Sequence, residues 1–144
     1  MKTEDKDLLL RDLCSRLPYG VKCQCFDETT IAILTGVKSK TELYFDELDY
    51  KEFDGIIKIE NVKPFLFPLL SITEEQRKEL QGEHLKDGQI LLGIAREIFV
   101  DKNMDKRALG ISRYAQDWCH KNHFDYRGLI EKGLANDATG LNIY

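Results

Sequence analysis

Residues 20–38 read GVKCQCFDETTIAILTGVK, and this stretch decides the fold because its apolar residues begin on the two-residue repeat of a β-strand. Val21, Cys23 and Cys25 alternate with polar residues, so a strand would place them on one face. Residues 29–38 are apolar on both faces at their centre, as a central strand is. A short polar link at 27–30 separates the two runs, so the sequence predicts a β-hairpin.

Upstream of this hairpin, the spacing of apolar residues changes to three and four, which predicts an amphipathic helix over residues 4–17. Acidic residues in its first turn suit the positive end of the helix dipole. Pro18 ends the helix because the residue before a proline avoids helical backbone angles. The expected buried stripe consists of Leu9, Leu10, Leu13, Cys14 and Leu17.

Downstream of the hairpin, the sequence predicts further strands. Residues 41–45, TELYF, are a candidate third strand, and residues 55–62, GIIKIENV, are a clearer one because apolar and charged residues alternate. Pro64 is expected to close that strand. Pro68 interrupts the next apolar run, residues 65–72, which we therefore expect to be a connector laid across the sheet.

Helical spacing returns after this connector. Two capping boxes compete for the first helix start, Ser71 with Glu74 and Thr73 with Gln76, so its register stays open. The expected helices span residues 73–85, 88–100 and 107–122, and the buried side of the last contains Ile111, Ala115 and Trp118.

A short final helix is expected next. Asp125 suits its N-cap, where a carboxylate accepts from the first free amides. Gly133 suits the left-handed position after its end, and Leu134 then meets Leu129, as in a Schellman motif. Phe124 and Leu129 would form a hydrophobic staple at the start, so Leu129 is expected to serve both ends of the helix.

These elements predict an α+β fold within a single domain, residues 1–144. An N-terminal helix, 4–17, precedes a small antiparallel sheet of about three or four strands in residues 20–63. A helical region, 73–133, packs on one face of the sheet, and residues 136–144 form a tail.

The composition, with 42% hydrophobic residues and a net charge of −4, fits a globular protein and gives no general reason to expect nucleic acid or acidic membranes as partners. No apolar run approaches the roughly 18 residues of a membrane span. The N-terminus lacks the pattern of a signal peptide, so we expect a cytoplasmic location. Reduced, buried thiols are then expected at Cys14, Cys23, Cys25 and Cys119.

Residues 42–54 carry the strongest local charge bias, with six acids against Lys51. A solvated loop explains it, and so does an acidic contact surface for a basic protein partner. A calcium loop is not expected, because the D-x-D-x-D-G pattern is absent. The candidate partner-binding residues are Glu42, Asp46, Glu47, Asp49, Glu52 and Asp54.

Cys119, His120 and His123 are weak candidates for metal ligands or catalytic groups. Helical spacing could bring two of them together, but the sequence nominates no third or fourth metal ligand. Cys119 and His120 would point about 100° apart on a helix, so their adjacency does not make a catalytic dyad. We expect His120 to be exposed and Cys119 to lie near the buried face, where a thiol tends to be inert.

No common catalytic or nucleotide-binding motif is present, neither G-x-S-x-G, a P-loop, G-x-G-x-x-G nor H-E-x-x-H. No catalytic residue, cofactor or metal is therefore assigned. An enzyme is the less favoured reading.

A basic patch lies at residues 102–113, where Asp105 alone opposes four cations. Two helices joined by a turn around Phe124 and Asp125 could also be read as a helix-turn-helix. Its second helix would be short and poor in base-reading groups. The candidate nucleic-acid residues are Lys102, Lys106, Arg107 and Arg113.

Three segments resemble a group of small uncharacterised proteins of prophages and mobile elements of gut bacteria. They are DLCSRLPYGVKCQC at 12–25, IKIENVKPFLFPLLSITEEQ at 57–76 and NHFDYRGLIEKGLA at 122–135. The resemblance implies a phage-like protein in a bacterial or phage-infected cytoplasm. It implies no activity and no site residues.

Three functions are therefore weighed. The first is a non-enzymatic interaction protein that binds a host or phage protein through residues 42–54 and their aromatic neighbours. The second is a nucleic-acid-associated accessory protein that uses the basic patch. The third and least favoured is a small metal-dependent or Cys/His enzyme.

Overall fold

The structure is a computed structural model that describes residues 1–46, 54–76, 79 and 113–144, with the side chains of the last segment described from residue 116 onward. The chain forms two compact units, which are described separately. Unit 1 contains residues 1–66 and 129–144, and unit 2 contains residues 67–128. The predicted helices at 88–100 and most of 73–85 lie outside the described residues.

Unit 1 begins with helix α1, Thr3–Arg16, which confirms the predicted N-terminal helix. A single 3₁₀ turn, η1, Leu17–Tyr19, continues it past Pro18, and Gly20 ends the turn at a φ of 65°, where glycine carries no steric penalty. Leu9 and Leu13 are fully buried, as predicted, whereas Cys14 is exposed. Cys14 therefore does not belong to the buried stripe, and the expectation that all four cysteines are buried is wrong at this position.

The buried side of α1 instead contains an ion pair that the spacing of apolar residues did not reveal. Asp12 and Arg16 are both 0% exposed, and the Arg16 Nε lies 2.7 Å from the Asp12 Oδ2. A second bond joins Arg16 Nη2 to Asp12 Oδ1 at 3.1 Å, so the guanidinium engages both carboxylate oxygens.

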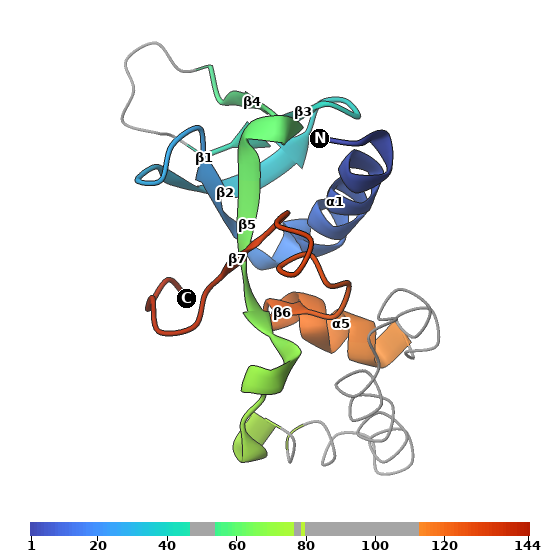
Figure 1. Ribbon diagram of the computed structural model, residues 1–144, viewed down its shortest axis with the longest axis vertical. Helices are drawn as coiled ribbons and strands as arrows, with labels where there is room; N and C mark the ends of the chain where they lie inside the picture. The colour runs from blue at the N-terminus through green and yellow to red at the C-terminus, as the bar shows by residue number, and fades with distance from the viewer. Residues whose placement is uncertain (47–53, 77–78, 80–112) are drawn as a thin grey trace. The chain divides into compact units, whose positions relative to one another are not determined.

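The predicted hairpin is confirmed, because β1, Lys22–Cys25, pairs antiparallel with β2, Ile31–Val37. β3, Glu42–Phe45, and β4, Ile56–Lys58, extend the sheet as antiparallel neighbours. Buried residues alternate along β1, β2 and β3, and α1 lies beside the sheet in Figure 1. Leu9 and Leu13 of α1 join the sheet's buried residues in one hydrophobic core.

The strand predicted over 55–62 ends earlier than expected. After β4 the chain turns through η2, Ile59–Asn61, and enters β5, Val62–Pro68. Pro64 therefore does not close a strand, and residues 65–68 are not a connector across the sheet. Both predictions are wrong.

The position of Pro64 in the hydrogen-bond pattern explains why a strand tolerates it. Asn61 accepts a hydrogen bond from the Phe26 amide, and Gln24 and Cys23 of β1 lie opposite Lys63 and Pro64 of β5. Backbone groups of an antiparallel pair face the partner at alternate residues, so residues 61 and 63 face β1 and residue 64 faces away from it. The opposite edge of β5 is paired only from Phe65 onward, so the missing N–H of Pro64 interrupts no ladder bond.

Strand β5 also pairs in parallel with two short segments from the C-terminal part of the chain. In unit 1 it pairs with β7, Asn136–Asp137, which lies in the predicted tail. In unit 2, Phe67 and Pro68 pair with β6, Phe124–Asp125. The α+β class is therefore correct, but the described residues form a mixed sheet of seven strands, so the prediction of three or four antiparallel strands is wrong.

Unit 2 continues from β5 through η3, Leu69–Ser71, into a helix start that settles the competition between capping boxes. The Thr73 amide donates to the Gln76 Oε1 at 2.9 Å, and the Gln76 amide donates to the Thr73 hydroxyl at 3.2 Å. Thr73 and Gln76 therefore form the reciprocal capping box. Helix α5, Arg113–Lys121, covers the later part of the helix predicted at 107–122.

The predicted helix after Asp125 is absent. Asp125 lies in β6 rather than at an N-cap, and Gly128 has a φ of 73°, outside the helical range. Residues 129–133 form a turn. A helix-turn-helix is therefore excluded here, because no second helix follows α5.

The far end of that turn agrees with the prediction. Gly133 has a φ of 71° and donates its amide to the Ile130 carbonyl at 3.0 Å. The Leu134 amide donates to the Leu129 carbonyl at 2.9 Å. These two bonds are the Schellman pattern, and both Leu129 and Leu134 are buried, as expected.

Among the helices within the described ranges, none has the length and apolar character needed to cross a membrane.

Candidate functional site

The outward face of the sheet in unit 1 carries apolar side chains at positions where solvent-facing strands usually have polar ones. Ile31 is 43% exposed and Tyr44 is 39% exposed. Strand alternation places both opposite the buried core residues, and the same holds for half-buried Ile33 and Ile56. We call these four residues the outward strip: Ile31, Ile33, Tyr44 and Ile56.

The strand register arranges the outward strip as two pairs on one face of the sheet, and Gly36 of β2 lies opposite Tyr44. Ile31 and Ile33 are successive outward residues of β2, and Tyr44 lies directly opposite Ile56 in the β3–β4 ladder. On the other side of β2, Ile31 faces Gln24 and Ile33 faces Lys22. The apolar strip therefore crosses three strands and is bordered by polar side chains on β1.

A β-bulge positions Tyr44 within this strip. The β2–β3 register shifts between Leu34 and Gly36, which places Gly36 opposite Tyr44. A Cβ atom at Gly36 would lie 3.3 Å from the Tyr44 Cδ2, so any larger residue at this position would press on the ring. Bulges of this kind reorient side chains, and here the reoriented side chain is an exposed aromatic ring.

Asp46 stabilises the same bulge. Its Oδ1 accepts a hydrogen bond from the Ile33 amide at 2.6 Å, and its own amide donates to the Ile33 carbonyl at 3.0 Å. The Asp46 side chain thus completes the β2–β3 ladder where β3 has ended. Asp46, predicted as a partner-binding residue, has a structural role in the described chain.

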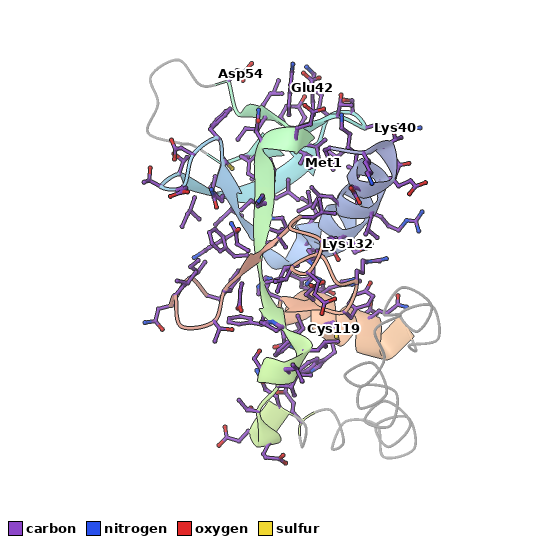
Figure 2. All side chains as sticks on the ribbon, in the orientation of Figure 1. Met1, Lys40, Glu42, Asp54, Cys119 and Lys132 are labelled. Carbon is purple, nitrogen blue, oxygen red and sulfur yellow. The ribbon has the colours of Figure 1, made fainter. Side chains whose placement is uncertain are left out.

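Two of the other predicted acidic residues are described and lie on the margin of unit 1, where Figure 2 labels them. Glu42 forms an exposed ion pair with Lys38 at 3.3 Å, and Asp54 accepts from the Ile56 amide at 3.0 Å. The remaining three, Glu47, Asp49 and Glu52, lie outside the described residues. Together with Asp46 and Asp54, they belong to the connection between β3 and β4, which joins the strands that carry Tyr44 and Ile56.

The β1–β2 loop presents a further exposed ring that the sequence analysis did not single out. Phe26 is 56% exposed and has a φ of 62°, an uncommon conformation for a bulky residue. The Asp27 amide donates to the Cys25 carbonyl at 2.7 Å, which makes Phe26 the central residue of the strained form of γ-turn.

Asp27 holds this loop in place. Its Oδ1 accepts from the Thr29 amide, the Thr29 hydroxyl and the Thr30 amide at 2.8–2.9 Å. Interactions with Thr30, and next with Thr29, lower the pKa of the Asp27 carboxyl because they stabilise its charged form. The loop therefore holds the Phe26 backbone at its positive φ, with the side chain exposed.

The Cys/His cluster of unit 2 is buried, which corrects the expectation that His120 is exposed. His120 is 5% and His123 8% exposed, and the Cys119 side chain, labelled on α5 in Figure 2, is also buried, as predicted. His120 Nε2 lies 2.8 Å from the Tyr126 hydroxyl, and the Arg127 Cζ lies 4.8 Å from the Tyr126 ring centroid. The helical wheel placed His120 on the exposed side of the helix because it considers only the helix itself. The residue that contacts His120, Tyr126, follows β6.

This cluster has the features of a packed interior. Trp118 stacks on Phe124 with ring centroids 5.2 Å apart and planes 9° from parallel, and Phe67 approaches Phe124 at 5.9 Å. In the described segments, no three His, Cys, Asp or Glu side chains gather as metal ligands would. The histidines here contribute buried polar contacts in an aromatic environment.

The buried cysteines of β1 are also unsuited to nucleophilic chemistry. Burial, with a smaller contribution from Asp46, raises the pKa of Cys25 to about 12. Burial likewise raises the pKa of Cys23, with smaller contributions from Cys25 and Asp12. Both thiols are protonated at neutral pH, and the thiolate is the reactive form.

The predicted basic patch is largely outside the described residues. Lys102, Lys106 and Arg107 are not described, and Arg113 is the first residue of α5. Nucleic-acid association stays a prediction.

The sequence analysis missed the outward strip because it treated residues 29–38 as buried on both faces. A signal was available. Gly36 within a β-branched strand marks a bulge or a close approach, and Tyr44 alternates with two large apolar residues. Comparisons of the chain with protein-family models, with curated proteins and with solved structures give no match.

Proposed function

We propose that this protein is a non-enzymatic binding module that uses the outward strip and the acidic β3–β4 connection to bind another protein. The observation that carries this proposal is the exposed Tyr44 ring, which a bulge, Gly36 and the Asp46 side chain hold on the solvent side of the sheet. Aromatic residues in fixed positions are typical of the energetic centres of protein interfaces.

Charge defines the chemistry of the partner. Residues 42–54 contain six acids and one lysine, so the sequence between the strands of Tyr44 and Ile56 is strongly negative. A complementary partner presents an apolar patch bordered by Lys or Arg side chains. The resemblance of residues 12–25, 57–76 and 122–135 to phage-encoded proteins directs the search to bacterial host and phage proteins.

The exposed Phe26 supports the same class of function. A bulky residue at positive φ costs stability, and strain of this kind often accompanies a binding role. Phe26 directly follows Cys25, the last residue of β1, in the loop that leads to Ile31 at the start of β2. It extends the set of exposed apolar side chains beyond the outward strip.

The test begins with capture of bacterial proteins on the immobilised chain and continues with affinity measurements on the purified partner. The double variant Ile31→Ser with Tyr44→Ser should weaken binding at least about tenfold, as expected for interface centres worth more than 1 kcal/mol. Leu70→Ser, at an exposed leucine of unit 2, is the matched control and should bind as the wild type does. If the double variant and the wild type bind the partner with equal affinity, the outward strip is not the binding surface.

A second pair of variants tests the described acids at the two margins of residues 42–54, Glu42 at the start of β3 and Asp54 before β4. Glu42→Gln and Asp54→Asn remove the charges and keep side-chain oxygens, so Asp54→Asn retains an acceptor for the Ile56 amide. The combined variant should slow association and reduce its dependence on salt, because exposed charges act mainly on the association rate. If the combined variant associates at low salt as fast as the wild type does, charge complementarity does not contribute to binding. The outward strip would then be the whole of the proposed interface.

The nucleic-acid alternative predicts a different result. A gel shift that weakens with salt and is lost when Lys106 and Arg107 are reversed to acids would support it. No described contact favours it.

A further inference from the structure

The β1–β5 ladder of unit 1 is opened at one pair of residues, and a side chain occupies the opening. Gln24 lies opposite Lys63, so the register places Lys22 opposite Phe65 two residues further along. Phe26 donates its amide to Asn61, and hydrogen-bonded pairs recur at every second residue of an antiparallel ladder. Lys22 and Phe65 should therefore exchange a direct backbone hydrogen bond.

The Tyr144 hydroxyl takes the place of that bond. The Lys22 amide donates to the Tyr144 hydroxyl at 2.9 Å, and the hydroxyl donates to the Phe65 carbonyl at 2.9 Å. A phenol hydroxyl can accept and donate at once, whereas a phenylalanine ring can do neither. Burial raises the pKa of Tyr144, so the hydroxyl keeps the proton that it donates.

The Lys22 side chain completes the surroundings of the ring. Its ammonium donates to the Ile143 carbonyl at 2.6 Å and lies 5.8 Å from the centroid of the Tyr144 ring. A cation within about 6 Å of a ring centroid is attracted to the electron-rich face of the ring. One residue, Lys22, thus contacts the hydroxyl through its backbone and the ring through its side chain.

The segment that carries Tyr144 is attached to the unit at few points. Asn136 donates to the Gln24 side chain at 2.6 Å, and the Ala138 amide donates to the Leu66 carbonyl at 2.8 Å. Between Ala138 and Tyr144 the chain is mostly exposed, with Leu141 at 52%, and Tyr144 itself remains 42% exposed. The hydroxyl end of the ring is held by the two backbone groups, while the residue as a whole remains partly open to solvent.

We propose that the opening between Lys22 and Phe65 is a binding site for a phenol group, which Tyr144 of the same chain fills. The site consists of a backbone donor, a backbone acceptor and a cation beside the ring. It selects a tyrosine side chain over a phenylalanine side chain because only the phenol satisfies both backbone groups. Lys22 also borders the outward strip opposite Ile33, but the phenol site includes no residue of the strip itself and does not depend on the protein partner.

Chemical rescue tests this site directly. Tyr144→Gly removes the phenol, and p-cresol carries the same atoms as the missing side chain. Added p-cresol should raise the Tm of Tyr144→Gly in a concentration-dependent way, because a ligand that binds only the folded state stabilises it. Toluene lacks the hydroxyl and 4-methylanisole lacks its proton, so each should raise the Tm less than p-cresol does.

Tyr144→Phe provides a second measurement on a chain that keeps the ring. Native-state hydrogen exchange at the Lys22 amide should become several-fold faster in Tyr144→Phe, because the amide loses its acceptor. Tyr19→Phe removes a hydroxyl from another exposed tyrosine and should leave that exchange rate unchanged. Equal Tm shifts with p-cresol and toluene, or an unchanged Lys22 exchange rate in Tyr144→Phe, would overturn the proposal.

Discussion

Asp12 and Arg16 form an ion pair with both side chains 0% exposed, one helical turn apart on the buried side of α1. Two hydrogen bonds of 2.7 and 3.1 Å join the guanidinium to the two carboxylate oxygens. The two hydrogen bonds offset part of the free energy that both charges lose by leaving water, and removing one partner would leave the other charge uncompensated.

Removing one partner of this pair should destabilise the protein strongly. Asp12→Ala leaves the Arg16 charge buried, and we expect the free energy of unfolding to fall by about 3–5 kcal/mol. Urea unfolding followed by circular dichroism measures this change. Glu42→Ala breaks the exposed pair with Lys38 and should cost less than about 1 kcal/mol. Similar losses in the two variants would show that burial does not set the strength of the Asp12–Arg16 pair.

Leu129→Ala should also destabilise the fold, because Leu129 is 0% exposed and belongs to the core of unit 1. The expected loss is about 2–5 kcal/mol, from lost apolar burial and the cavity left behind. Thermal unfolding would show it as a lower Tm. Leu141→Ala, at a leucine that is 52% exposed, is the control and should change the Tm little. An unchanged Tm in Leu129→Ala would count against its place in the core.

Gly133→Ala tests the backbone rather than the packing. No atom lies within 4 Å of a Cβ placed at Gly133, so space is available. The φ of 71° nevertheless disfavours any L side chain, and we expect a loss of about 1–2 kcal/mol. Gly133→Asn should lose less, because asparagine tolerates the left-handed region. The reverse order of the two variants in urea unfolding would contradict this reading.

Asp27 should make the stability of the β1–β2 loop depend on pH. The folded-state pKa of Asp27 is lowered, so the ionised carboxylate stabilises the folded protein above its unfolded pKa of about 3.9. That contribution disappears as the pH falls through the folded pKa. The difference in unfolding free energy between wild type and Asp27→Ala should therefore be constant above about pH 5 and shrink below about pH 4. If wild type and Asp27→Ala still differ in unfolding free energy at the lowest pH, the stabilisation by Asp27 comes from packing and not from its charge.

The four cysteines should react in a defined order with iodoacetamide. Cys14 is exposed, whereas Cys23, Cys25 and Cys119 are buried. Burial holds the pKa of Cys25 at about 12, so almost no thiolate forms at mildly alkaline pH. Mass spectrometry after brief labelling should find Cys14 modified and the other three modified only after unfolding. Early labelling of Cys25 would show that the hairpin opens in the native state.

The elements that could be predicted from the sequence are those whose signals are local. The repeats of two and of three to four residues locate β1, β2 and α1, and glycine in the left-handed region marks the turn at Gly133. For the helix that follows η3, the sequence alone leaves two capping boxes possible. The hydrogen bonds between Thr73 and Gln76 show which of the two forms.

The errors concern residues whose environment comes from distant parts of the chain. Pro64 and Pro68 stand in a strand because the ladder bonds of β5 fall on other residues. His120 is buried because Tyr126, beyond β6, supplies its hydrogen-bond partner. An acid and a base four residues apart, as Asp12 and Arg16 are, are common on exposed helix faces. The burial of this pair therefore becomes evident only from the packing of α1 against the sheet.

Strand β5 has a consequence for the order in which the chain folds during synthesis. Residues 1–66 supply α1 and the antiparallel strands, so these contacts can form as soon as that part leaves the ribosome. The second edge of β5 in unit 1 finds its partner only at Asn136 and Asp137, some seventy residues later. Until then that edge stays open, and pairing over such a long separation is slow. A nascent chain of this protein therefore exposes an unpaired strand edge while the residues between β5 and β7 are being synthesised, which is the interval in which chaperones would have to protect it.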